Sequence, residues 1–80
     1  MKYIWKTLKD GSYEKEYQIV DAVGRICGEV YGRNYCGPIT EWNAVVFPIN
    51  KPAFHLGYFI TEAKAKLAVE TKLKCRKDRG

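Results

Sequence analysis

The 80-residue sequence has little of the chemistry from which metal centres and disulfide frameworks are built. It contains one histidine, His55, and three cysteines, Cys27, Cys36 and Cys75. An odd number of widely spaced cysteines is not a disulfide framework, and reduced thiols are typical of intracellular proteins. The sequence leaves open whether Cys27 and Cys36 form a disulfide in an oxidising sample. Because a zinc site needs about four ligands at recognisable spacing, we expect no metal and no cofactor.

Long apolar segments are also missing. No run approaches the roughly 18 apolar residues that a membrane-spanning helix needs. Lys6 interrupts the apolar start of the chain before the core of a signal peptide can form. We therefore expect a soluble, cytoplasmic protein that has no contact with membranes.

Compact catalytic motifs are missing as well. The sequence has no glycine-rich phosphate loop and no nucleophile elbow. A catalytic site would have to combine His55 with Cys27 or Cys36, or use Glu14 and Glu16, which share one face of an expected strand. A strand histidine with satisfied hydrogen bonds and a solvated acidic edge explain the same residues. The sequence therefore predicts a protein that is not an enzyme.

What the sequence does contain is the composition of one small folded domain, with 46% hydrophobic and 14% aromatic residues. Asp10-Gly11 is a strong signal for a hairpin between two extended segments. Alternation and turn residues predict strands at 2–8, 13–20, 25–31, 41–47 and 54–59, and a helix at 62–74 capped by Thr61. We expect an α+β fold in which an antiparallel β-meander of four or five strands packs on one C-terminal α-helix. The domain would span residues 1–75, followed by a basic tail of residues 76–80.

The expected helix has one face that suits packing on a sheet. Its members are small or apolar, or have a long aliphatic stem: Ala65, Ala68, Val69, Lys72 and Leu73. Leu67 falls on the opposite side. Either an N-terminal element covers Leu67 or it is an exposed contact point.

Positive charge is concentrated in the last quarter of the chain. The formal net charge is +5. The basic residues after residue 60 are Lys64, Lys66, Lys72, Lys74, Arg76, Lys77 and Arg79. Such a field can attract phosphates or an acidic protein surface. A solubilising helix end explains the same residues.

Aromatic residues exceed what a core under one helix comfortably buries, because the chain has six tyrosines and two tryptophans. One face of the sheet packs on the helix, so the other is open or covered by a partner. We expect Tyr31, Tyr35, Trp42 and Tyr58 on that second face and its rim, where they would bind a partner. The alternative is that Trp42 belongs to the core and the tyrosines line the edge of the sheet.

One segment carries a family resemblance. Leu56, Gly57, Phe59, Thr61, Ala65 and Ala68 form a strand, a Leu-Gly-x-Phe motif, a capping threonine and an Ala-rich helix. This pattern resembles the end of AP2-type and integrase arm-type DNA-binding domains. A bulge at Gly57 would bring Leu56 and Phe59 to the same face of the sheet.

That resemblance implies docking of the open sheet on DNA through arginines. Here the four arginines, Arg25, Arg33, Arg76 and Arg79, lie at expected turns and in the tail, whereas guanine recognition needs Arg or Lys on the docked element. The overall layout is also similar to short phage and prophage proteins built as a β-meander closed by one helix.

Two functions follow from these observations. The first is a small, basic, non-enzymatic interaction protein, a phage-type accessory factor that binds and modulates, or inhibits, a host protein or nucleoprotein complex. The second is a nucleic-acid-binding module with its sheet on DNA and its basic helix end on phosphates.

Overall fold

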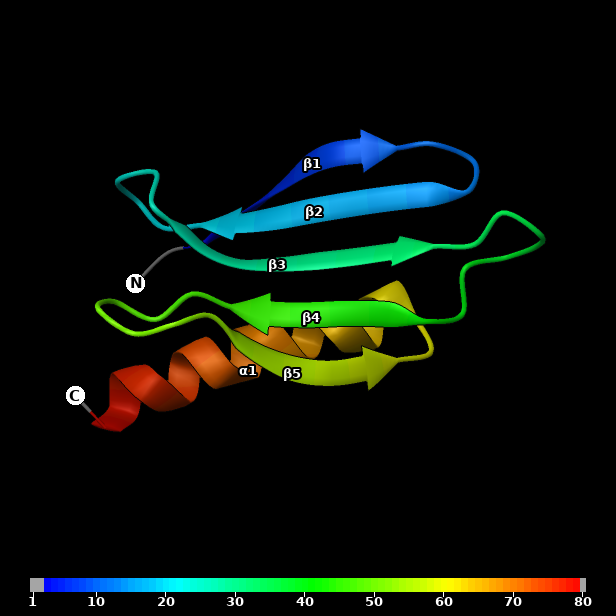
Figure 1. Cartoon of the computed structure of the whole chain (residues 1–80). Helices are drawn as coiled ribbons and strands as arrows, with labels where there is room; N and C mark the ends of the chain where they lie inside the picture. Colours follow the sequence, from blue (N-terminus) through cyan, green and yellow to red (C-terminus); the bar gives the residue numbers. More distant parts are fainter. Residues whose placement is uncertain (1–2, 80) are drawn as a thin grey trace.

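Five strands and one helix follow one another along the described part of the chain. The computed structural model describes residues 3–79, with the side chains of residues 3–74. The elements are β1 (Ile4–Asp10), β2 (Glu14–Val20), β3 (Ile26–Arg33), β4 (Trp42–Val46), β5 (Phe54–Phe59) and α1 (Glu62–Arg79). The strands pair in chain order as one antiparallel sheet, and α1 lies on one of its faces (Figure 1). The predicted α+β meander packed on one helix is confirmed.

Two local predictions, a hairpin turn and a β-bulge, are found in the structure. The hairpin at Asp10-Gly11 joins β1 to β2, and the Gly11 amide donates to the carbonyl of Glu14 over 2.8 Å. In β5, Gly57 and His55 pair with neighbouring residues of β4, so Leu56 is the extra residue of a bulge. Gly57 has φ 126°, which favours glycine. Leu56 and Phe59 both pack against the core, which confirms the predicted bulge.

The helix is longer than predicted, because it continues beyond residue 74 to Arg79. No Gly or Pro interrupts residues 62–79. Basic residues near a helix C-terminus also interact favourably with the helix dipole. Residues 76–79 of the expected tail therefore continue α1.

The core lies between α1 and the sheet. Val69 and Leu73 of the expected helix face are buried with Ala65, and Ala68 is half-buried. Gly28 allows the close approach, since a Cβ there would lie 2.8 Å from Cγ1 of Val69. The other buried members of this core come from the sheet: Tyr17, Ile19, Cys27, Val30, Trp42, Ala44 and Val46.

Trp42 is therefore in the core, and the prediction that it lies on the open face is wrong. Its side chain is 5% exposed, and its ring stacks on Tyr17 with centroids 6.4 Å apart. Trp42 shares a strand face with Ala44 and Val46, and α1 covers that face. Gly32 on the neighbouring strand leaves room for the indole, because a Cβ there would lie 3.0 Å from it.

A set of polar contacts joins the β1–β2 hairpin to α1. The indole Nε1 of Trp5 donates to Glu70 over 2.7 Å, and the hydroxyl of Tyr17 donates to Glu62 over 3.1 Å. Lys66 pairs with Glu62 over 2.8 Å, and its Nζ lies 3.9 Å from the ring centroid of Tyr17. These side-chain contacts hold β1 and β2 to the helix.

Candidate binding site on the open sheet face

The sheet face that points away from α1 is uncovered by any other described element. Two of the predicted partner-binding residues lie on it, Tyr31 on β3 and Tyr58 on β5. Both are register partners of Asn43 on β4, so the three side chains form a row across the sheet. Tyr31 is 39% exposed and Tyr58 is 66% exposed. His55, on the same strand as Tyr58, lies beside this row, and its ring centroid is 5.1 Å from that of Tyr58.

Tyr35 lies elsewhere. It belongs to the loop between β3 and β4, where its ring packs on Tyr13 with centroids 4.7 Å apart. Asn34 shapes this loop, since its side chain donates to the carbonyl of Pro38 over 2.8 Å and accepts from the amide of Cys36 over 3.0 Å. Tyr35 is therefore exposed in a loop and does not belong to a strand of the open face.

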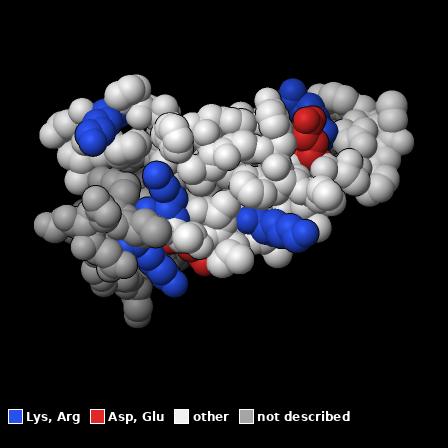
Figure 2. Space-filling view, turned by 90° about the horizontal axis from the view of Figure 1, so that it is seen from below, with Lys and Arg blue, Asp and Glu red and all other residues white. Residues whose placement is uncertain are grey.

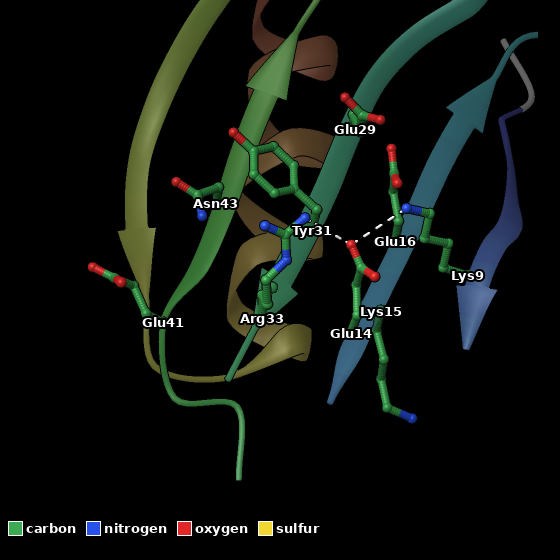
Figure 3. A pocket seen from close by; sticks show the side chains of 10 residues that line it. Lys9, Glu14, Lys15, Glu16, Glu29, Tyr31, Arg33, Glu41 and Asn43 are labelled. Atoms are coloured by element: carbon green, nitrogen blue, oxygen red, sulfur yellow. Dashed lines mark hydrogen bonds and ion pairs between the residues drawn. The ribbon is translucent and has the colours of Figure 1, made fainter. Parts of the chain in front are cut away.

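A hollow of about 490 Å³ lies next to the row of aromatics. Side chains of β1, β2 and β3 and of the start of β4 surround it (Figure 3). Tyr31 and Asn43 form one side of the hollow, so it is continuous with the aromatic row. The charged residues that line it are Lys9, Glu14, Lys15, Glu16, Glu29, Arg33 and Glu41.

One of these carboxylates is already paired. Glu14 accepts from Arg33 over 2.7 Å and from Lys9 over 3.3 Å, and both contacts are drawn in Figure 3. The hydrogen bond from Arg33, followed by that from Lys9, lowers the pKa of Glu14. In turn, Glu14 raises the pKa of Arg33. The positive charge of Arg33 is therefore balanced within the protein.

Glu16 and Glu29 form no such ion pair with any of the described side chains. In Figure 3 their carboxyl groups lie close together above the Glu14 pair. Burial raises the pKa of Glu29 to about 7, and the hydrogen bond and repulsion from Glu16 add to this effect. Within the described side chains, no ion pair includes Glu16, Glu29 or Glu41. The hollow thus contains carboxyl groups that a further cation could neutralise.

These acidic residues were not among the predicted binding residues, although the sequence holds a signal for them. Glu14 and Glu16 have the parity opposite to the buried residues Tyr17 and Ile19 of β2, and Glu29 lies between buried positions of β3. Alternation places each set on the open face. The register between the strands is needed to bring Glu16 and Glu29 together.

The predicted phosphate-binding residues divide into three groups. Lys64, Lys72 and Lys74 are exposed on α1. Lys66 is engaged with Glu62 and lies over the rings of Tyr17 and Trp5. The side chains of Arg76, Lys77 and Arg79 lie outside the described residues.

No helix within residues 3–79 combines the length and the apolar character that a membrane crossing demands. Over the same residues, no group of three or more His, Cys, Asp or Glu side chains is placed to hold a metal ion.

Comparisons of the chain with family models, curated proteins and solved structures found no match. The resemblance to AP2-type and integrase arm-type domains therefore stays a prediction.

Proposed function

We propose that this chain is a non-enzymatic interaction protein, and that its open sheet face binds a basic side chain of a partner protein. The observation that carries the proposal is the hollow beside Tyr31, in which Glu16 and Glu29 lie together while the cations that line it pair with other carboxylates. The role would be that of a phage-type accessory factor, which modulates or inhibits a host protein by occupying one of its basic surfaces.

The electrostatics of the hollow favour a cationic group. Two carboxyl groups that are partly removed from water and close to each other resist ionisation together. A guanidinium group would neutralise both, and its planar set of donors matches carboxylate oxygens. Binding of arginine or lysine would therefore lower the pKa of Glu29, which burial and, to a lesser extent, Glu16 raise.

The aromatic row supplies the remaining contact area. Tyr31 and Tyr58 are exposed, and tyrosine is enriched among the residues that contribute most to protein interfaces. A cation that enters the hollow also passes the ring of Tyr31, where a cation–π contact adds to the attraction. The proposed surface therefore combines a charged anchor with aromatic contacts.

The same face is poorly suited to DNA. Four glutamates line the hollow, and phosphate groups would be repelled by those that are ionised. The single arginine there, Arg33, is paired with Glu14. These features support a protein partner on this face over the nucleic-acid alternative, in which the sheet docks on DNA.

Titration of ¹⁵N-labelled protein, followed by amide chemical shifts, tests the proposal. The probe is a short peptide with two arginines, and its matched control has citrulline in place of both. We expect the arginine peptide to shift the amides of Glu16, Glu29 and Tyr31. The citrulline peptide should leave them unchanged.

Two variants define the specificity of that result. Glu29→Gln should weaken binding of the arginine peptide several-fold, because it removes one negative charge from the hollow. Lys74→Gln, on the exposed part of α1, should have no effect. Shifts of the open face by duplex DNA, or equal shifts with both peptides, would refute the proposal. A partner captured from lysate after nuclease treatment can then be purified and tested in the same way.

A further inference from the structure

A second surface lies where β5 and α1 meet. It holds two adjoining hollows, of about 580 and about 370 Å³, and Lys72 lines both. Figure 2 views the molecule from this side and shows separate Lys and Arg side chains, and some acidic ones, on a surface that is mainly uncharged. We call this surface the β5–α1 groove, and its apolar floor comes from Leu56, Phe59, Leu67, Ala68, Pro52 and Phe54.

The apolar part of the groove is accessible. Leu67 is 61% exposed. Of the two alternatives left by the sequence, this favours an exposed contact point over a residue covered by an N-terminal element. Below Leu67, Leu56 and Phe59 are only partly buried, although the bulge turns both toward the core. Phe54 at the other end is 52% exposed. Exposed apolar side chains that lie next to one another mark interaction sites.

The charged side chains that line the described part of the groove have one sign. They are Lys64, Lys72 and Lys51, and none of the described lining residues is acidic. Lys72 also lies over the ring of Phe54, with Nζ 5.2 Å from the centroid. The groove thus offers apolar contacts between ammonium groups. It is complementary to a segment that carries apolar residues flanked by Asp or Glu.

The free edge of β5 is not suited to pairing with another strand. β5 is the last strand of the sheet, so its outer edge has no partner strand. Pro52 lies just before it, and the bulge at Leu56 and Gly57 interrupts its regular backbone. Bulges and prolines block strand addition at sheet edges. The groove is therefore better suited to contact with side chains, as in recognition of an amphipathic helix.

From these observations we propose that the β5–α1 groove binds an acidic amphipathic segment of a partner protein. The apolar side chains of that segment pack on Leu67, Leu56 and Phe59, and its carboxylates face Lys64 and Lys72. This surface lies on the helix side of β5, away from the hollow on the open face. It is therefore a second site, independent of the proposed function.

Fluorescence anisotropy with a designed peptide tests this site. The probe is a labelled peptide of about fourteen residues with Leu at the i, i+3, i+4 and i+7 positions of a helix and Glu between them. One control peptide has Ser in place of Leu, and the other has Lys in place of Glu. We expect binding of the first peptide only, with weaker binding as salt rises from about 50 to about 300 mM.

Variants of exposed residues locate the binding without disturbing the core. Leu67→Ser should weaken binding about tenfold, the effect of removing one buried leucine contact. Lys64→Glu should weaken it several-fold, while Lys6→Glu, which makes the same charge change on exposed β1, should not. Glu29→Gln should also leave it unchanged, which separates this result from that of the open face.

Three outcomes would overturn the proposal. Equal binding of either control peptide would remove the required combination of apolar and acidic groups. No loss of affinity in both Leu67→Ser and Lys64→Glu would place the peptide elsewhere. Stronger, Leu67-dependent binding of phosphatidylserine vesicles or duplex DNA would assign the groove to a lipid or a nucleic acid.

Discussion

Replacement of Glu29 by glutamine should change the dependence of stability on pH in a defined direction. Burial and Glu16 raise the pKa of Glu29 from 4.5 to about 7 in the folded protein. Below pH 4.5 the carboxyl is protonated in both the folded and the unfolded state, so it adds no dependence on pH. Between pH 4.5 and 7 the unfolded chain loses this proton first. The free energy of unfolding of the wild type therefore falls as pH rises through this range.

The size of the effect follows from the same two values. A rise in pKa from 4.5 to about 7 corresponds to about 3.4 kcal/mol at full strength. Glu29 is only half-buried and titrates together with Glu16, so solvent screening and proton sharing reduce this to about 1–2 kcal/mol. Glu29→Gln has the same shape and keeps a donor for Glu16. It should therefore be more stable than the wild type by that amount near pH 8, and equally stable near pH 4.

Urea denaturation at several pH values measures this difference, with tryptophan fluorescence as the probe. Glu14→Gln is the control of opposite sign. Because Arg33 and Lys9 lower the pKa of Glu14, its ion pairs stabilise the fold above pH 4.5 and are lost as pH falls through the lowered pKa. That variant should be less stable near pH 8. If wild type and Glu29→Gln show the same pH dependence between about pH 5 and 8, the proposed environment of Glu29 is wrong.

Two further variants test the packing of α1. Gly28→Ala should lower the free energy of unfolding, measured by urea denaturation, by about 1–3 kcal/mol, because the new Cβ would meet Val69 at 2.8 Å. Gly37→Ala is the control, since the nearest neighbour of its Cβ lies at 3.9 Å. Equal stability of the two variants would contradict the contact between Gly28 and Val69. Lys66→Gln should lower the melting temperature and cost about 1 kcal/mol through its lost ion pair and ring contacts. Lys64→Gln should leave the stability unchanged. Equal losses of stability in the two variants would show that the ion pair and ring contacts of Lys66 do not stabilise the fold.

The order of elements could be predicted from the sequence because each signal is local. Asp10-Gly11 gives the first hairpin, and alternation of apolar residues marks the strands. The bulge in β5 was also predictable, since Leu56 and Phe59 need the same face and Gly57 tolerates the positive φ between them. The helix end was not, because residues 76–79, which are mostly basic, fit both a tail and the last turn of a helix.

The site was only partly predictable. Tyr31 and Tyr58 lie on the open face as expected, whereas Trp42 does not. β4 has apolar residues on both faces, so its alternation alone does not say which face the helix covers. Likewise, the pairing of Glu16 with Tyr31 depends on the register between β2 and β3, which a bulge after Ile19 sets. Neither the face that the helix covers nor the register between strands can be read from the sequence of a single strand.

The position of Lys66 could not be predicted from the sequence either. Sequence places it in a basic segment, and the structure places its ammonium group over the ring of Tyr17, next to Glu62. Only the orientation of α1 on the sheet brings residues from the two ends of the chain together. Positive charge in the sequence therefore overstates the number of lysines available to a partner.

The order of the elements has a consequence for biosynthesis. A ribosome makes the whole meander before it makes Ala65, Val69 and Leu73, the helical residues that close the core. Until those residues leave the exit tunnel, the nascent strands carry an uncovered apolar side that chaperones can recognise. Completion of folding must therefore wait for the end of translation of this segment, however quickly the hairpins form.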